Sequence, residues 1–254
     1  MIPGTVKEFL HQALRRVGID IVRYPAPLHL PDFSLEQLEI ISKVRPYTMT
    51  SIERLVALLK VVGYIVENQI PGDIAECGVW RGGSMMTVAL ALLLRGDRSR
   101  DLYLYDTFEG MPPPTEHDRS FHGTPAEVQL KETPAGTGIW CYAGLEDVRT
   151  NLLSTGYPVE KIHFIRGKVE ETIPQTVPAK LSLLRLDTDW YESTRHELVH
   201  LYPILSRAGC LIIDDYGAWQ GARKAVDEYF GAMGQPVYLH RIDYTGRLMI
   251  KSGS

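Results

Sequence analysis

The segment Asp73–Ser84 (DIAECGVWRGGS) constrains the fold of this chain more than any other part of the sequence. A short run with strand character reaches Glu76, and glycines at positions 78, 82 and 83 then interrupt the chain. An apolar helix is expected over residues 85–94, with Ser84 as its cap. A strand, a glycine-rich turn and a helix start present free backbone N–H groups and let a ligand approach the backbone. The segment therefore predicts a site for a nucleotide-like cofactor.

An acid in this loop separates it from a dinucleotide site. The dinucleotide fingerprint has three glycines spaced G-x-G-x-x-G and binds pyrophosphate, which the Glu76 carboxylate would repel. The same carboxylate suits a cofactor that carries an ammonium group. The order of Glu76, Gly78 and Gly82 resembles the first motif of class I S-adenosylmethionine-dependent methyltransferases, whose cofactor ends in an amino acid. The competing interpretation is a plain strand–turn–helix corner with incidental glycines.

Strands and helices alternate along most of the chain. Further strands are expected over residues 101–106, 161–167, 181–186, 209–213, 237–242 and 247–250. Helices are expected over residues 52–65, 145–153, 198–205 and 222–230. The alternation predicts a Rossmann-like, doubly wound α/β fold whose mostly parallel sheet is covered on both faces. The last two strands, joined by the turn Asp243–Gly246, predict an antiparallel C-terminal hairpin.

Two segments lie outside this alternation. Residues 1–47 predict a helical N-terminal extension, with an amphipathic helix over residues 5–17 and a second helix from Ser34. This extension is expected to be a cap or dimerisation arm, or a plain packed extension, of a domain over 48–254. Residues 111–143 contain three consecutive prolines and no clear periodicity. Long irregular segments of this kind are commonly lids or binding loops, so a lid-like insertion is expected, the alternative being a disordered one.

Acids or a glycine follow the successive strands, at the edge where open α/β sheets bind ligands. After the first strand these residues are Asp106, Gly167, Asp187, Asp189, Asp214 and Asp215. Asp106 is expected to bind ribose hydroxyls. Because clustered carboxylates repel one another, Asp187, Asp214 and Asp215 predict a divalent cation with oxygen ligands, such as magnesium, calcium or manganese. Helix capping is the alternative role for each acid taken singly.

Composition and patterning exclude several classes of protein. The net charge of −4 gives no general attraction to nucleic acid. Three cysteines without CxxC spacing argue against a disulfide framework or a zinc site and fit a reducing cytosol. His196 and His200 are spaced for a metal but lack a third ligand nearby. No apolar run of 18 residues is present, so a cytoplasmic protein without a membrane partner is expected.

Five motifs together resemble one family. They are Tyr47–Ser51 (YTMTS), Glu76–Ser84 (ECGVWRGGS), Asp106–Gly110 (DTFEG), Arg185–Tyr191 (RLDTDWY) and Ile212–Tyr216 (IIDDY). In this order they resemble the macrocin O-methyltransferase family, mycinamicin-type enzymes included, which is a class I S-adenosylmethionine-dependent group that methylates sugar hydroxyls on macrolides and aminocoumarins. The resemblance runs from about residue 47 to the C-terminus and leaves 111–143 uncovered.

The resemblance implies roles for individual residues. The cofactor S-adenosylmethionine would contact Thr50, Ser51, Glu76, Gly78, Ser84, Asp106, Gly167, Val169 and Asp187. The implied ligands of Mg²⁺ are Asp187, Asp214 and Asp215. We expect Asp187 to act also as the base that deprotonates the acceptor, and Asp189 is the alternative base.

The expected function is S-adenosylmethionine- and magnesium-dependent methylation of a hydroxyl on a sugar or a glycosylated natural product. Methyl transfer from a sulfonium is an in-line displacement, so positioning supplies much of the rate, and a metal activates the poor hydroxyl nucleophile. The alternatives are a catechol-type methyltransferase acting on a phenol and a non-catalytic cofactor-binding module. A small-molecule acceptor and a homo-oligomer, dimeric or larger, are the expected partners.

Overall fold

The computed structural model describes residues 33–134, 138–234 and 236–253 of the chain. The helix expected over residues 5–17 lies outside these residues. The chain divides into two compact units, residues 1–38 and 39–254. In the first unit, α2 (Leu35–Val44) begins after Ser34, where a helix start was predicted. Ser34 and Gln37 form a capping box there: Gln37 N donates to Ser34 Oγ (3.3 Å) and Ser34 N donates to Gln37 Oε1 (3.0 Å).

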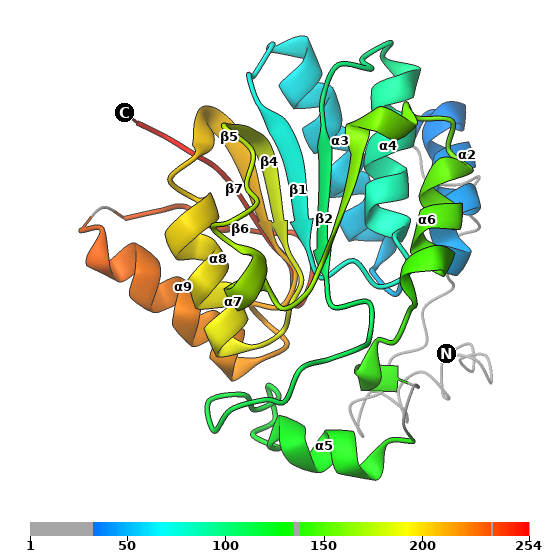
Figure 1. Cartoon of the computed structure of the whole chain (residues 1–254). Coiled ribbons are helices and arrows are strands. Elements are labelled where there is room, and N and C mark those ends of the chain that lie inside the picture. Colours follow the sequence, from blue (N-terminus) through cyan, green and yellow to red (C-terminus); the bar gives the residue numbers. More distant parts are fainter. Residues whose placement is uncertain (1–32, 135–137, 235, 254) are drawn as a thin grey trace, which may run out of the picture. The chain divides into compact units, whose positions relative to one another are not determined.

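A seven-stranded sheet runs through the described part of the second unit. Its strands are β1 (Asp73–Cys77), β2 (Leu102–Asp106), β3 (Ile162–Arg166), β4 (Leu181–Leu186), β5 (Leu205–Ile213), β6 (His240–Arg241) and β7 (Arg247–Ile250). Their order is β3-β2-β1-β4-β5-β7-β6. The first five strands are parallel, and β7 is antiparallel to both β5 and β6. The predicted doubly wound sheet with an antiparallel C-terminal hairpin is confirmed (Figure 1).

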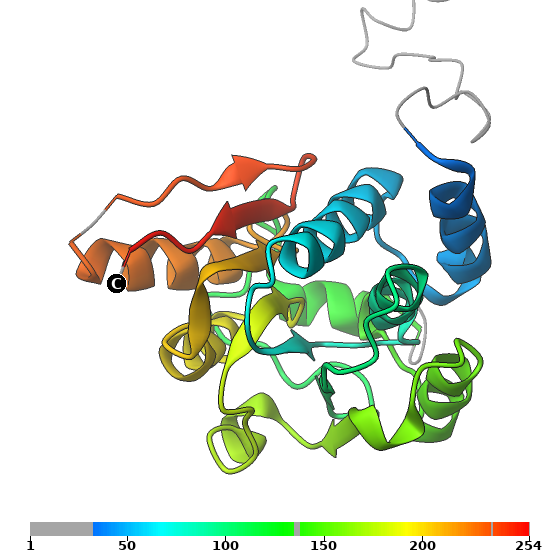
Figure 2. The ribbon, with the colours of Figure 1, turned by 90° about the horizontal axis from the view of Figure 1, so that it is seen from above.

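Helices cover both faces of this sheet (Figures 1 and 2). One face carries α3 (Ile52–Glu67), α4 (Gly83–Leu94) and α6 (Leu145–Leu153). The other carries α7 (Val169–Thr172), α8 (Tyr191–Leu201) and α9 (Gln220–Ala232). The short 3₁₀ helices are Arg45–Tyr47, Gly138–Trp140 and Val159–Lys161. None of the helices in the described ranges combines the length and apolarity needed to cross a bilayer.

Burial on both faces explains the composition of the central strands. All six residues of β4 (LSLLRL) are buried, as expected for a parallel strand between two helical layers. Ala75 and Cys77 of β1 pack into the core on the α8–α9 side with Leu198 and Val226. The same burial means that the one arginine in β4, Arg185, needs charged partners inside the protein.

Two predicted boundaries are wrong for local reasons. Ser84 does not cap α4, because the helix already begins at Gly83 and its N-cap is Gly82, whose φ of 84° favours glycine. Leu205 belongs to β5 and not to the preceding helix, because α8 ends at Leu201 and Pro203 cannot continue it.

The insertion at residues 111–143 is more structured than expected. It contains α5 (Ala126–Glu132), a helix too short to give a visible apolar period. Ala126 and Leu130 of α5 bury their side chains in a small core with Trp190. In Figure 1 this helix lies below the sheet, at the end where β2 leads into the insertion.

Asp118 fastens the insertion to the start of α8. Its Oδ1 accepts a hydrogen bond from Tyr191 N (2.8 Å), and its Oδ2 accepts from Thr115 N (2.6 Å) and Thr115 Oγ1 (2.9 Å). The Trp190 indole adds a bond to the carbonyl of Pro112 (2.9 Å). The segment predicted as a lid is therefore tied to the loop that follows β4.

We expect Asp118→Ala to loosen this insertion. Asp118 is 1% exposed and accepts three hydrogen bonds, and each loss of a bond to a charged group costs roughly 1.5–3 kcal/mol. Limited trypsin digestion should therefore cleave the variant faster at Arg119 or Lys131. Glu116→Ala, at an exposed neighbouring position, is the control. Equal cleavage of both variants would contradict an anchoring role for Asp118.

Candidate active site

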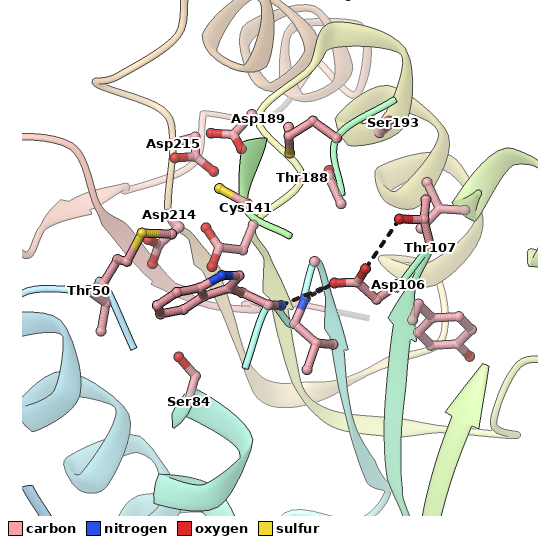
Figure 3. A pocket seen from close by; sticks show the side chains of 18 of the residues that line it. Thr50, Ser84, Asp106, Thr107, Cys141, Thr188, Asp189, Ser193, Asp214 and Asp215 are labelled. Carbon is pink, nitrogen blue, oxygen red and sulfur yellow. Dashed lines mark hydrogen bonds between the residues drawn. The ribbon is translucent and has the colours of Figure 1, made fainter. Parts of the chain in front are cut away.

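A cavity of about 290 Å³ opens at the carboxyl ends of the central strands (Figure 3). This is the edge where ligands bind in doubly wound sheets. The predicted site residues in its wall are Thr50, Gly78, Ser84, Asp106, Gly167, Val169, Asp187, Asp189, Asp214 and Asp215. Ser51 and Glu76 are the predicted residues that do not line it. The sequence motifs therefore converge on one cavity.

The hydrogen-bond ladder of the sheet continues one residue beyond each of four strands. The residue after each strand donates its backbone N–H to a neighbouring strand: Gly78 to Tyr105 O (2.9 Å), Gly167 to Asp106 O (3.0 Å), Asp187 to Cys77 O (2.9 Å) and Asp214 to Leu186 O (2.9 Å). These residues are therefore placed by sheet geometry and not by a flexible loop.

Asp106 holds the glycine loop in addition to facing the cavity. Its Oδ2 accepts hydrogen bonds from Val79 N (2.6 Å) and Trp80 N (3.1 Å), and its Oδ1 accepts from Phe108 N (2.7 Å). Burial raises the pKa of Asp106, and these backbone N–H groups oppose the rise. The position of this acid at the end of β2 was predicted, but its bracing of the loop after β1 was not.

Arg185 lies among three acids from three strands. Its Nη1 donates to Glu76 and to Asp187 Oδ2 (2.6 Å), and its Nη2 lies 2.7 Å from Asp214 Oδ1. Burial raises the pKa of Glu76 to about 7 against the opposing effect of this guanidinium. Sequence reasoning missed the role of Arg185, although an arginine in an otherwise apolar buried strand is a signal for a charged partner.

A second arginine joins the same network from α3. Arg54 donates to Asp214 and, through Nε, to Asp243 Oδ2 (2.8 Å). Ser51 caps α3 by accepting from Arg54 N (3.2 Å), and its hydroxyl donates to Asp243 Oδ2 (2.7 Å). Ser51 thus supports the wall of the cavity from behind.

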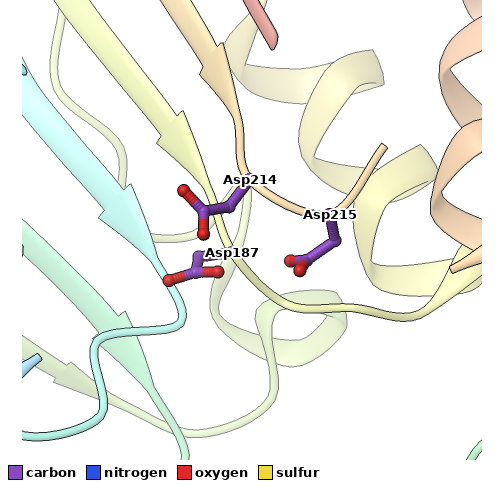
Figure 4. Close-up of side chains that lie close together, drawn as sticks. All are labelled: Asp187, Asp214 and Asp215. Atoms are coloured by element: carbon purple, nitrogen blue, oxygen red, sulfur yellow. The ribbon is translucent and has the colours of Figure 1, made fainter. Parts of the chain in front are cut away.

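Asp187, Asp214 and Asp215 form a group that could hold a cation (Figure 4). One carboxylate oxygen from each lies within 4.8 Å of the other two. Asp215 Oδ2 is buried and has no hydrogen-bond partner among the described residues. Burial raises the pKa of Asp215, and the charge of Asp189 adds to the rise. Oxygen ligands with an unsatisfied buried carboxylate fit a Mg²⁺ ion, which would relieve the repulsion.

Asp189 stands beside this group with an unusual backbone. Its φ is 65°, a left-handed value that costs a residue other than glycine roughly 1–3 kcal/mol. Figure 3 shows its carboxyl group next to that of Asp215. Burial raises the pKa of Asp189 to about 7, and the charge of Asp187 adds to the rise. Such a carboxyl group can accept a proton near neutral pH.

Several residues of the cavity wall were not predicted from the sequence. They are Arg54, Trp80, Met111, Pro112, Cys141, Tyr244 and Thr245, among others. Met111, Pro112 and Cys141 come from the two ends of the insertion, which is the segment expected to cover the substrate. Tyr244 and Thr245 come from the C-terminal hairpin, for which only a turn was predicted.

Known proteins match most of the chain. The family described as Macrocin-O-methyltransferase (TylF) matches residues 42–251. The 8-demethyl-8-(2,3-dimethoxy-alpha-L-rhamnosyl)-tetracenomycin-C 4'-O-methyltransferase of Streptomyces olivaceus is 36% identical over 200 residues, which cover 79% of this chain and 74% of that protein. The mycinamicin III 3''-O-methyltransferase of Micromonospora griseorubida is 32% identical over 200 residues, which cover 79% of this chain and 76% of that protein.

A solved structure of similar fold is that of the O-methyltransferase NovP. It superposes with a TM-score of 0.71 at 30% sequence identity, and the match covers 82% of this chain and 83% of that one.

Gly78→Ala is expected to destabilise the protein more than a matched glycine substitution. A Cβ at position 78, where φ is 79°, would overlap the carbonyl oxygen of Asp187, so the loops after β1 and β4 would have to separate. Gly96 has a similar φ of 71°, but nothing lies within 4 Å of its would-be Cβ. Urea denaturation should therefore show roughly 1–3 kcal/mol of left-handed strain in Gly96→Ala and a larger loss in Gly78→Ala. Equal losses of stability in the two variants would mean that the Asp187 carbonyl can move away from a Cβ at position 78 at no cost.

Proposed function

The chain belongs to the macrocin O-methyltransferase family, and we propose that it uses S-adenosylmethionine and magnesium to methylate a hydroxyl of a sugar or glycosylated natural product. The observation that carries this proposal is one cavity in which the glycine loop, Asp106 and the Asp187–Asp214–Asp215 group meet. The two relatives named for sugar positions of a rhamnosyl-tetracenomycin and of mycinamicin III support a glycosylated acceptor.

The cofactor would lie between the glycine loop and the ends of β2 and β3. Gly78, Asp106 and Gly167 would hold its adenosyl part, and Thr50 and Ser84 would lie nearer its amino-acid end. Thr50 Oγ1 is buried without a hydrogen-bond partner among the described residues, which fits a polar ligand there. When bound, S-adenosylmethionine supplies the methyl group on a positively charged sulfur.

Glu76 fits the ammonium group of such a cofactor through one of its two oxygens. The other oxygen is engaged by Arg185, whereas Oε2 is buried and accepts no hydrogen bond from any described residue. A buried carboxylate oxygen without a partner is unfavourable, so a cationic donor would stabilise it. Contact between Glu76 and the ammonium group stays a prediction, since Glu76 lies behind the cavity wall.

Asp187, Asp214 and Asp215 would hold the magnesium ion. A bound magnesium ion supplies Lewis acidity that lowers the pKa of the acceptor hydroxyl. Arg185 and Arg54 hold the Asp187 and Asp214 carboxylates in place, so these two side chains keep a fixed geometry. Ordered ligands of this kind reduce the entropic cost of positioning the acceptor.

We assign the base role to Asp189 in preference to Asp187. The Asp187 carboxylate is already engaged, because it accepts a hydrogen bond from Arg185 Nη1 at 2.6 Å and belongs to the proposed metal ligands. Burial raises the pKa of Asp187, and the Arg185 guanidinium opposes that rise. Asp189 lies in the cavity wall, two residues farther along the chain, in a strained backbone conformation. Its role is to take the hydroxyl proton as the oxygen attacks the methyl group.

The test of this function is methyl transfer to a panel of acceptors. The chain is incubated with S-adenosylmethionine labelled in the methyl group, Mg²⁺, and rhamnosides, macrolide glycosides, aminocoumarin glycosides or catechol. Label is expected in a glycoside and not in catechol, and excess chelator should abolish the transfer. Label in catechol alone would favour the catechol-type alternative, and cofactor binding without any transfer would favour a non-catalytic module.

The metal assignment has a readout independent of turnover. Titration with Mn²⁺ followed by electron paramagnetic resonance should reveal one bound ion in the wild type. Asp215→Asn should weaken this binding by about tenfold or more, because a ligand charge is lost. Glu132→Gln, at an exposed position on α5, should bind Mn²⁺ normally. Unchanged binding by Asp215→Asn would remove this acid from the metal site.

Comparing two ligands on the wild type and on Asp106→Ala tests whether Asp106 binds the ribose. The wild type should bind S-adenosylhomocysteine more tightly than its 2'-deoxyribosyl analogue, by roughly 1.5–3 kcal/mol for a hydrogen bond to a charged group. Asp106→Ala should bind both ligands equally weakly, which separates ribose recognition from its bracing of the loop. Glu109→Ala, whose side chain is 66% exposed, is the control. Preserved discrimination in Asp106→Ala would contradict ribose binding by this residue.

A further inference from the structure

The turn between β6 and β7 reaches the cavity beside the acidic group. β7 pairs antiparallel with β5, and Ile213 is the register partner of Arg247, so the turn before β7 lies at the carboxyl end of β5. The Gly217 N–H donates to the carbonyl of Thr245 (3.0 Å). Tyr244 and Thr245 consequently line the same cavity as Asp214 and Asp215.

Thr245 presents a buried hydroxyl that nothing in the described chain satisfies. The residue is 4% exposed, and its Oγ1 has no hydrogen-bond partner among the described residues. Its backbone groups are both engaged, because its N–H donates to Asp243 Oδ1 (2.9 Å) and its carbonyl accepts from Gly217. A buried, unpartnered hydroxyl in a cavity wall is unfavourable unless a ligand bonds to it.

Tyr244, the residue before Thr245, is exposed to solvent where Thr245 is buried. Its side chain is 71% exposed although it belongs to the cavity wall. A large aromatic ring at the mouth of a cavity offers an apolar surface with a polar tip. A flat ring beside a buried hydroxyl matches the two kinds of surface on a pyranose, namely its C–H face and its hydroxyl groups.

The turn is held rigidly enough to preorganise this pair. Asp243 accepts hydrogen bonds from Thr245 N and Gly246 N (2.7 Å) through Oδ1, and from Ser51 Oγ (2.7 Å) and Arg54 Nε (2.8 Å) through Oδ2. The turn is therefore docked on the start of α3. Preorganised contacts lose less freedom when a ligand binds.

The position in the sheet assigns this pair to the acceptor and not to the cofactor. The proposed adenosyl contacts are Asp106, which ends β2, and Gly167, which follows β3, and both strands lie at one end of the strand order. The turn lies beyond β5 on the opposite side, and the carboxylates that follow β4 and β5 lie between. A ligand on the turn would thus face the adenosyl part of the cofactor across the acidic group.

We propose that Tyr244 and Thr245 form a sugar-binding subsite for the acceptor. The Tyr244 ring packs against the C–H face of the pyranose that carries or adjoins the reacting hydroxyl. The Thr245 hydroxyl bonds to a hydroxyl of the same sugar. This inference rests on the proposed methyltransferase function and extends it to the class of group that the acceptor side recognises.

The test measures glycoside binding separately from cofactor binding. The probes are 4-nitrophenyl α-L-rhamnopyranoside and 4-nitrophenyl β-D-glucopyranoside, titrated by NMR with saturating S-adenosylhomocysteine and Mg²⁺ present. The wild type should bind at least one probe, and Tyr244→Ala and Thr245→Val should each weaken it by about five- to tenfold. Thr245→Ser keeps the hydroxyl and should bind within about threefold of the wild type. Tyr238→Ala, which removes a tyrosine that is 80% exposed outside the cavity wall, should have no effect.

Calorimetry of S-adenosylhomocysteine binding separates the possible failures. Cofactor affinity should be unchanged in Tyr244→Ala and Thr245→Val, and a loss of it would overturn the acceptor assignment. Glycoside binding equal to that of the wild type in both variants would overturn the subsite. The subsite would also be overturned if the wild type bound S-adenosylhomocysteine and 4-nitrophenol but neither glycoside. That result would leave the methyltransferase proposal standing. A wild type that binds no S-adenosylhomocysteine would overturn both proposals.

Discussion

Arg185 lies within β4, a strand buried along its whole length, and its guanidinium keeps its charge at any ordinary pH. A buried arginine is tolerated because Glu76, Asp187 and Asp214 approach it from β1, β4 and β5. The dependence runs in both directions, since three acids could not share this space without the cation. Removing one partner of a buried pair costs roughly 3–5 kcal/mol, so the strand ends that build the site are tied to one side chain. Lysine could not replace it, because only the planar fork reaches separate carboxylates in fixed directions.

The cavity has two sides, and Asp187, Asp214 and Asp215 lie between them. Backbone amides and Asp106 form the side next to β2 and β3, and the C-terminal hairpin forms the side beyond β5. Met111, Pro112 and Cys141 from the two ends of the insertion also line this cavity, and Asp118 fastens the insertion to the chain that continues from Asp189 into α8. The Trp190 indole, which donates to the carbonyl of Pro112, adds a second link between the insertion and the loop that carries Asp189. In the proposed function, the cofactor, the reacting groups and the acceptor would lie in this order along the strand ends.

The sequence contained enough to predict the sheet and the acidic group, because parallel strands bring their carboxyl ends to one edge. Asp187 and Asp214 could be placed from their positions alone. Arg185 stood within a recognised motif, yet two of its three partners, Glu76 and Asp214, come from other strands, and linear spacing carries no information on neighbours across a sheet. α5 was missed because seven residues give less than two full apolar repeats. The burial of Thr245 in the cavity wall could not be predicted, because Thr245 lies in a turn whose position depends on how β7 pairs with β5. The N-terminal arm and the oligomeric state stay predictions.

The backbone hydrogen bonds that continue beyond the strand ends affect how the protein unfolds. Functional loops usually belong to the least stable part of a fold and exchange their amide hydrogens early. Here the N–H groups of Gly78, Asp187 and Asp214 are bonded to central strands, so we expect them to exchange more slowly than the N–H groups of an ordinary loop. The acidic edge is therefore expected to open with the central strands and not with the loops. Partial opening under heat or denaturant would disorder the periphery first and leave the reactive groups in register.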